Sequence, residues 1–99
     1  MKKSAAPNTT YAHRWFTSRD GLSLYARDYP GGDGPARLPV VCIHGLTRNS
    51  SDFDHIAQRI AATGRRVISV DVRGRGRSER AADPMTYQPP VYARDIIDM

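Results

Sequence analysis

The residues best suited to chemistry stand at positions 44 and 45, a His-Gly dipeptide that follows the apolar run 40–43. A strand that ends in a glycine turn and leads into a helix presents backbone N–H groups to an anion. Ordinary connections between a strand and a helix use the same turn residues and a serine cap. Residues 39–50 are therefore consistent with an anion-stabilising site or with a plain connector. The residues that follow must distinguish these two interpretations.

A second polar group, residues 71–78, follows the next apolar run. Its arginines and glycines alternate, a spacing that suggests a nucleic-acid-binding segment. Base stacking needs aromatic side chains, and none is interleaved here, so a solvated turn is favoured. The segment also resembles the nucleophile elbow Gly-x-Ser-x-Gly at Ser78, but Arg80 stands in place of the last glycine, and prolines follow instead of a helix. Ser78 is therefore not predicted to be a nucleophile.

Periodicity predicts the elements that position these groups. Two alternating runs, residues 13–18 and 22–29, flank an Asp-Gly pair and predict an antiparallel hairpin. Residues 40–43 are apolar without alternation, which predicts a strand of a parallel sheet buried on both faces. A helix capped by Ser50 or Ser51 is predicted next. Its apolar stripe comprises Phe53, Ile56, Ala57, Ile60 and Ala61.

The run of residues 66–71 predicts a second buried strand. Strand, helix and strand of this length form a βαβ unit with a right-handed crossover. From Val91 another helix is predicted, with Tyr92, Ile96 and Met99 roughly on one side.

The composition fits one small soluble domain. The chain has 99 residues, of which 39% are apolar and 25% charged. No apolar run approaches the ~20 residues of a membrane span. Residues 1–7 lack the apolar core of a signal peptide, which favours a cytoplasmic protein, and residues 1–11 are predicted to be a disordered tail. A single cysteine, Cys42, excludes an internal disulfide and a cysteine-based metal cluster.

One alternative takes the βαβ unit as half of a dinucleotide-binding domain, because Asp71 stands where a ribose-binding carboxylate would lie. Such a domain needs the turn Gly-x-Gly-x-x-Gly, and no glycine follows Gly45 before the predicted helix. The next closely spaced pair, Gly74 and Gly76, comes after the second strand instead of the first. The glycine pattern therefore disfavours this alternative.

A second alternative is a non-enzymatic basic binding module. Fifteen basic against ten acidic residues give a formal charge of +5, which suits an electrostatic partner such as nucleic acid. The arginines that would form its surface are Arg65, Arg66, Arg73, Arg75 and Arg77.

Two motifs together resemble the opening of an α/β-hydrolase. They are Pro-Val-Val-Cys-Ile-His-Gly-Leu-Thr at residues 39–47 and Asp-x-Arg-Gly-x-Gly-x-Ser at residues 71–78. In that family the His-Gly of the first motif follows the third strand, and the second motif follows the fourth. The resemblance spans roughly residues 13–99 and implies an α/β fold, in which an N-terminal antiparallel strand pair leads into a parallel βαβ sheet. We therefore expect residues 12–99 to be the N-terminal part of an incomplete α/β-hydrolase fold, truncated before the nucleophile elbow.

The resemblance also implies roles for single residues. The backbone N–H of Leu46 is implied as one oxyanion-hole donor, with Gly45 allowing the sharp turn before it. His44 is implied to shape this loop and not to act as a catalytic base. The motif residues of the later turn are implied to be structural, through local hydrogen bonds: Asp71, Arg73, Gly74, Gly76 and Ser78.

The implied activity is hydrolysis of an ester, a lactone or a related carbonyl substrate. The nucleophile, acid and base would come from residues outside this sequence, so the 99 residues alone are expected to be inactive. No metal or organic cofactor is implied. The expected partner is a small-molecule substrate, without nucleic acid or membrane, and the sequence leaves the oligomeric state open.

Overall fold

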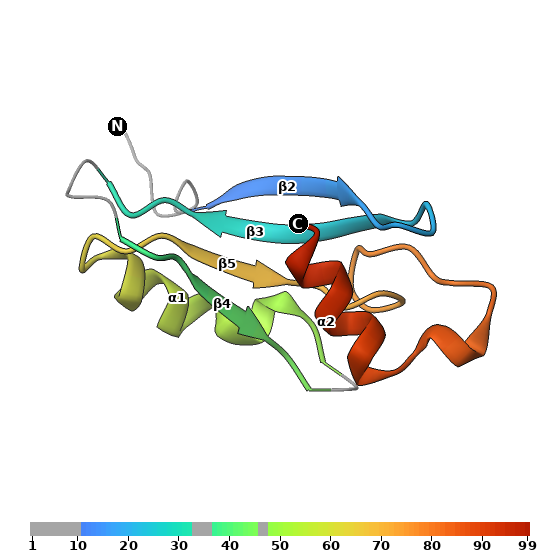
Figure 1. The fold of residues 1–99 in the computed structure, drawn as a ribbon. Helices are drawn as coiled ribbons and strands as arrows, with labels where there is room; N and C mark the ends of the chain where they lie inside the picture. Colours follow the sequence, from blue (N-terminus) through green and yellow to red (C-terminus); the bar gives the residue numbers. More distant parts are fainter. Residues whose placement is uncertain (1–10, 33–36, 46–47) are drawn as a thin grey trace.

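The computed structural model describes residues 11–32, 37–45 and 48–99. They form a four-stranded mixed sheet in the order β2-β3-β5-β4 (Figure 1). Strands β2 (Ala12–Thr17) and β3 (Ser23–Tyr29) make the predicted antiparallel hairpin, with Trp15 opposite Tyr25. Strand β5 (Val67–Val70) runs antiparallel to β3 and parallel to β4 (Val40–Ile43). The predicted strand pair leading into a parallel βαβ unit is therefore confirmed.

The two helices cover opposite faces of this sheet (Figure 1). Helix α1 (Asp54–Ala61) places Ala57 in a cluster with Tyr29, Cys42 and Val67. Helix α2 (Pro89–Ile97) places Ile96 against the other face, on Ala26, Ile68 and Val70. Neighbouring residues of β5 thus belong to different clusters, as strand alternation requires.

The start of the first helix differs from the prediction in its cap. A 3-10 turn, Ser50–Phe53, precedes α1, and the side chain of Asn49 accepts the hydrogen bond from the Ser51 backbone N–H. Asn49 therefore caps this 3-10 turn, in place of Ser50 or Ser51, and α1 itself begins after Phe53 without a side-chain cap. Ser50 is buried, and its own N–H donates to the carboxylate of Asp71.

The predicted apolar stripe is also one residue too wide. Ala57 is buried, and Phe53, Ile60 and Ala61 pack against the same cluster, but Ile56 is 53% exposed. Successive helical residues are rotated by about 100°, which places Ile56 beyond the arc that the other four occupy. The helix contacts the sheet through that narrower arc.

Strand β4 is not buried on both faces as predicted. Cys42 is buried against α1, whereas Val41 is 38% and Ile43 is 51% exposed. Within the described residues β4 pairs with β5 alone, so it stands at the sheet edge. Helix α2 covers the same face of the sheet but places Ile96 on Ala26 of β3 and on Ile68 and Val70 of β5.

The predicted tail, residues 1–11, lies outside the described residues except for Tyr11. The ring centroid of Tyr11 is 5.2 Å from that of Tyr29, at the side of the α1 cluster. Helices long and apolar enough to span a bilayer are absent from the described ranges.

Candidate functional site

A cleft of about 50 Å³ opens at the carboxyl ends of the parallel strands β4 and β5. Ligands of open α/β sheets bind at this edge, because the loops that leave parallel strands meet there. Both motifs singled out in the sequence contribute to it. The lining residues are Ile43, His44, Gly45, Val72, Arg73, Arg75 and Tyr92.

His44 is buried and connects the two loops. Its Nε2 accepts a hydrogen bond from the backbone N–H of Val72 at 2.9 Å, and its Nδ1 lies 2.6 Å from the Gly45 carbonyl oxygen. Since Nε2 accepts, Nδ1 carries the proton and donates to the carbonyl. Both ring nitrogens are thus engaged by backbone, an arrangement that suits a residue shaping the loop and leaves no basic nitrogen for proton transfer.

Asp71 is the first residue of the turn that follows β5. Its buried carboxylate accepts from the backbone N–H of Ser50 at 2.6 Å through Oδ1 and from that of Arg77 at 2.9 Å through Oδ2. The first bond holds the turn before α1, and the second folds the 71–78 segment back on itself. A buried carboxylate satisfied on both oxygens is the arrangement that offsets its loss of hydration.

Ser78 closes the same turn. Its buried hydroxyl donates to the carbonyl oxygen of Asp71 at 2.6 Å and accepts from the backbone N–H of Tyr25 at 2.9 Å. The hydroxyl therefore links the turn to β3. It does not point into the cleft, in keeping with the view that Ser78 is no nucleophile.

Gly76 is required by the position of Asp71. Its φ is +51°, and a Cβ added there would stand 2.3 Å from Asp71 Oδ2. Gly74, with φ +76°, is constrained from the other side, because a Cβ would lie 2.7 Å from the ring of Tyr87. The Tyr87 hydroxyl in turn accepts from the backbone N–H of Ala81 at 2.8 Å.

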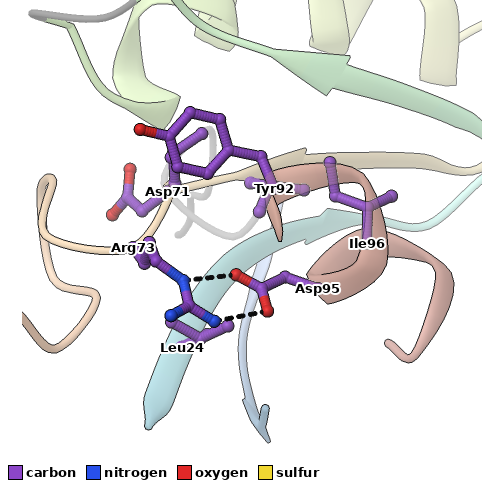
Figure 2. Close-up of a pocket in the computed structure, with 8 residues that line it drawn as sticks. Leu24, Asp71, Arg73, Tyr92, Asp95 and Ile96 are labelled. Atoms are coloured by element: carbon purple, nitrogen blue, oxygen red, sulfur yellow. Dashed lines mark hydrogen bonds and ion pairs between the residues drawn. The ribbon is translucent and has the colours of Figure 1, made fainter. Parts of the chain in front are cut away.

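Arg73 departs from the predicted local bonding. Its fully buried guanidinium donates to the two oxygens of Asp95 on α2 at 2.8 and 2.7 Å (Figure 2). It also donates to the two oxygens of Asp20, in the β2–β3 turn, at 2.8 and 3.1 Å. Asp95 is 22 residues and Asp20 is 53 residues from Arg73 in the sequence. The fold brings them together because the turn after β5 lies beside the hairpin turn and helix α2.

Arg73 and its two carboxylate partners, Asp20 and Asp95, are opposite charges in contact. Hydrogen bonds from Arg73 and then from Ser18 hold the pKa of Asp20 well below its ordinary value. The hydrogen bonds to Asp95 and then to Asp20 raise the pKa of Arg73. The arginine is thus a permanent cation, and its role is to join three segments.

Sequence reasoning missed Asp20 and Asp95, although one signal was present. Asp95 follows Tyr92 by three residues and precedes Ile96 and Met99, so it falls on the apolar side of its helix. A carboxylate on such a stripe is seldom buried unless it is paired. That position indicates a buried basic partner.

A second, smaller cavity lies between α2 and the sheet, lined by residues that include Leu24, Val70, Tyr92 and Ile96 (Figure 2). Its volume is about 10 Å³. One water needs roughly 10–15 Å³, so this space is too small for a ligand. Of these two spaces, the cleft at the carboxyl ends of β4 and β5 is therefore the better candidate site.

Leu46, the implied oxyanion donor, lies outside the described residues. Groups of three or more His, Cys, Asp or Glu side chains able to hold a metal ion do not occur in the described part of the chain.

Four arginines of the alternative basic module contact separate groups within the protein. Arg73 is buried with two carboxylates, and Arg66 is paired with Asp28 at 2.6 Å. Arg65 donates to the Leu38 carbonyl oxygen, and Arg77 lies over the ring of Tyr25.

Comparison with known proteins agrees with the geometry. Residues 39–98 match the family model described as alpha/beta hydrolase fold. The chain is 43% identical over 68 residues to a 3-hydroxybutyrate-oligomer hydrolase of Cupriavidus necator, covering 69% of this chain and 23% of that protein. It is 36% identical over 81 residues to a non-heme chloroperoxidase of Streptomyces lividans, covering 81% of this chain and 27% of that protein.

The fold is shared with solved structures. An alpha/beta hydrolase of Novosphingobium aromaticivorans superposes with a TM-score of 0.80 at 48% identity, over 89% of this chain and 30% of that one. A thioesterase domain of the curacin biosynthetic pathway superposes with a TM-score of 0.76 at 23% identity, over 89% of this chain and 31% of that one. The chain thus spans about a quarter to a third of the length of such relatives.

We expect Gly76→Ala to destabilise the protein far more than Gly21→Ala. Both glycines have positive φ, but a Cβ at Gly21 meets nothing within 4 Å. Gly21→Ala should therefore cost about 1–2 kcal/mol, the left-handed strain alone. Gly76→Ala must also displace the Asp71 carboxylate and should cost roughly 3 kcal/mol or more. Thermal or denaturant unfolding measures both, and equal losses would contradict this account.

The contribution of Asp20 to stability should depend on pH. Because its folded pKa lies below the unfolded value of about 3.9, the contribution is fully present above about pH 4 and is lost as pH falls towards the folded pKa. The Tm difference between wild type and Asp20→Asn should accordingly shrink from pH 7 to pH ~2. Other carboxyl groups with lowered pKa, such as Asp28, are common to both proteins and cancel in the difference. A difference that stays constant over this range would refute the ion-pair explanation.

Proposed function

The chain belongs to the α/β-hydrolase fold family, and from this premise we propose that it supplies the N-terminal part of an enzyme that hydrolyses an ester, a lactone or a related carbonyl compound. The proposal rests on one observation: the turn at Gly45 opens onto the cleft at the carboxyl edge of the parallel strands. The relative from Cupriavidus necator is named for a 3-hydroxybutyrate oligomer, whose units are joined by ester bonds. Its identity to this chain exceeds that of the chloroperoxidase, which favours ester chemistry.

We propose that the backbone N–H of Leu46 stabilises the oxyanion that forms when the carbonyl is attacked. Leu46 directly follows Gly45, whose carbonyl is held by His44, and His44 is held by Val72. These bonds preorganise the path of the chain up to the proposed donor. One such donor is worth about 3–4 kcal/mol of barrier, because it is oriented before the charge develops.

The remaining catalytic groups would lie in sequence beyond these 99 residues. No Gly-x-Ser-x-Gly segment occurs in the chain. In the proposed mechanism a serine attacks the carbonyl carbon while a histidine accepts its proton, and a carboxylate orients the histidine. The Leu46 amide would hold the resulting oxyanion until the leaving group departs.

We also infer that the partner of the enzyme is a small molecule, and neither nucleic acid nor a membrane. The inference is supported by the cleft at the sheet edge and by the separate attachments of Arg65, Arg66, Arg73 and Arg77.

The 99-residue chain alone should not hydrolyse 4-nitrophenyl acetate above the buffer rate, because it lacks a nucleophile. Release of nitrophenolate, followed by absorbance, measures this. The complete enzyme is the positive control, and the same enzyme with its elbow serine changed to alanine should fall to near the rate of the isolated chain. Turnover by the isolated chain would overturn the assignment of the nucleophile to other sequence.

In the complete enzyme, Leu46→Pro should lower kcat by about 10²-fold or more, because proline has no N–H to donate to the oxyanion. Leu46→Ala is the matched control, since it removes the side chain and keeps the amide. It should retain a kcat close to that of wild type. Steady-state kinetics on 4-nitrophenyl acetate, with circular dichroism to verify folding, test the pair. Equal kcat values for the two variants would remove Leu46 from this role.

A further inference from the structure

We propose that the outer edge of β2 is a dimer interface, at which the β2 strand of a second copy pairs antiparallel and joins the two four-stranded sheets into one. The proposal does not depend on the hydrolase function. Its basis is an open strand edge whose backbone groups and side chains fit a copy of themselves in one register.

Strand β2 lies at the edge of the sheet and, within the described residues, pairs with β3 alone (Figure 1). It is the longer of the two edge strands there, with six residues against four in β4. Its pairing with β3 runs from Ala12 to Thr17 without a bulge, and the strand contains neither lysine nor proline. Bulges, lysines and prolines are the usual devices that keep an edge from pairing with another chain. The β2 edge is therefore suited to sheet extension.

The hydrogen bonds of β3 show which backbone groups of β2 face outward. The carbonyl oxygen of Tyr25 accepts from the N–H of Asp71, and the Tyr25 N–H donates to the Ser78 hydroxyl. Both groups of Tyr25 thus point away from β2. Trp15, which stands opposite Tyr25, is therefore in a non-hydrogen-bonded pair, and its own N–H and C=O face the open edge. Residues two positions away along β2 share this orientation.

Symmetry restricts how two such edges can pair. A two-fold axis perpendicular to the sheet makes the two β2 strands antiparallel and keeps each face of the sheet on the same side in both copies. Opposite residues then share a face, so the register must be centred on a residue and not between two residues. Within Ala12–Thr17, the two registers with the longest overlap are centred on Arg14 and on Trp15.

Charge selects the register centred on Trp15. Centring on Arg14 would place the two Arg14 side chains directly opposite each other, where like charges destabilise the pair. Centring on Trp15 places the two indole rings opposite each other and His13 opposite Thr17 of the second copy. The outward N–H and C=O groups of these residues then form the hydrogen-bonded pairs. Arg14 lies opposite Phe16 of the second copy, so charged residues of β2 do not oppose one another.

The side chains at this edge favour the same partner. Trp15 is 53% exposed, although its ring centroid lies 5.0 Å from that of Tyr25. In the dimer the indole of the second copy would cover part of this exposed ring, and aromatic cross-strand pairs stabilise sheets. The charge of Arg14 is already bound to Asp28 at 3.0 Å. It therefore does not confront the second copy as an unpaired cation.

The complete enzyme should be a dimer at micromolar concentration, as measured by sedimentation velocity. Trp15→Lys removes the aromatic pair and places two like charges opposite each other, so it should raise the dissociation constant of the dimer about tenfold or more. Met85→Lys is the matched control, because it also replaces an exposed apolar side chain by lysine but lies outside β2. It should leave the dimer intact, and circular dichroism verifies that both variants fold. A monomeric wild type, or equal dissociation constants for the two variants, would overturn the interface.

Single cysteines test the register, with copper–phenanthroline as the oxidant. Trp15→Cys should give a disulfide-linked dimer, because the two central residues lie about 5.5 Å apart between Cα atoms, within the span of a disulfide. Arg14→Cys should cross-link far less, since its two copies are offset along the strands and lie roughly 8 Å apart. Cys42 is buried and common to both variants. Cross-linking of Arg14→Cys in preference to Trp15→Cys, or of neither, would refute the proposed pairing.

Discussion

The interaction on which the site depends is the pair of hydrogen bonds accepted by the buried carboxylate of Asp71. One oxygen holds the backbone of Ser50, where the chain enters α1, and the other holds Arg77, where the 71–78 turn closes. An ionised carboxylate removed from water needs such partners, so both segments are confined to positions from which they can donate. Gly76 follows from this constraint, since a side chain there would occupy the space of the carboxylate. The two loops that border the cleft are thereby fixed relative to each other.

Arg73 extends this frame to segments that are distant in sequence. It joins the hairpin turn at Asp20 and helix α2 at Asp95 to the turn after β5. The net stability of a buried ion pair is small once desolvation is counted, whereas removing one partner leaves a costly unpaired charge. The main consequence of these ion pairs is that they fix the position of helix α2. Helix α2 is held so that Tyr92 forms a wall of the cleft, beside Val72.

Features of the fold and of the candidate site were predictable where their pattern lies within a short stretch of sequence. Features that depend on contacts between distant segments were not. Strand alternation and the Asp-Gly pair predicted the hairpin, and the two glycine motifs predicted the fold family, because these patterns lie within short stretches. The exposure of Val41 and Ile43 could not be read from β4, since burial depends on which elements flank the strand. The partners of Arg73 were missed for the same reason. Of the two partners, only Asp95 has a sequence position that indicates an ion pair, because it lies on the apolar side of its helix.

These constraints also bear on how catalysis and selectivity would be coupled. The 71–78 turn holds His44 through the N–H of Val72, and His44 holds the carbonyl of Gly45, next to the proposed oxyanion donor. The same turn supplies Val72, Arg73 and Arg75 to the lining of the cleft. A displacement of this turn would therefore move the proposed oxyanion donor and this part of the cleft lining together. Side chains that only hold the turn, such as Asp71 and Ser78, can accordingly influence both properties without touching a substrate, because the geometry of the cleft is transmitted through their hydrogen bonds.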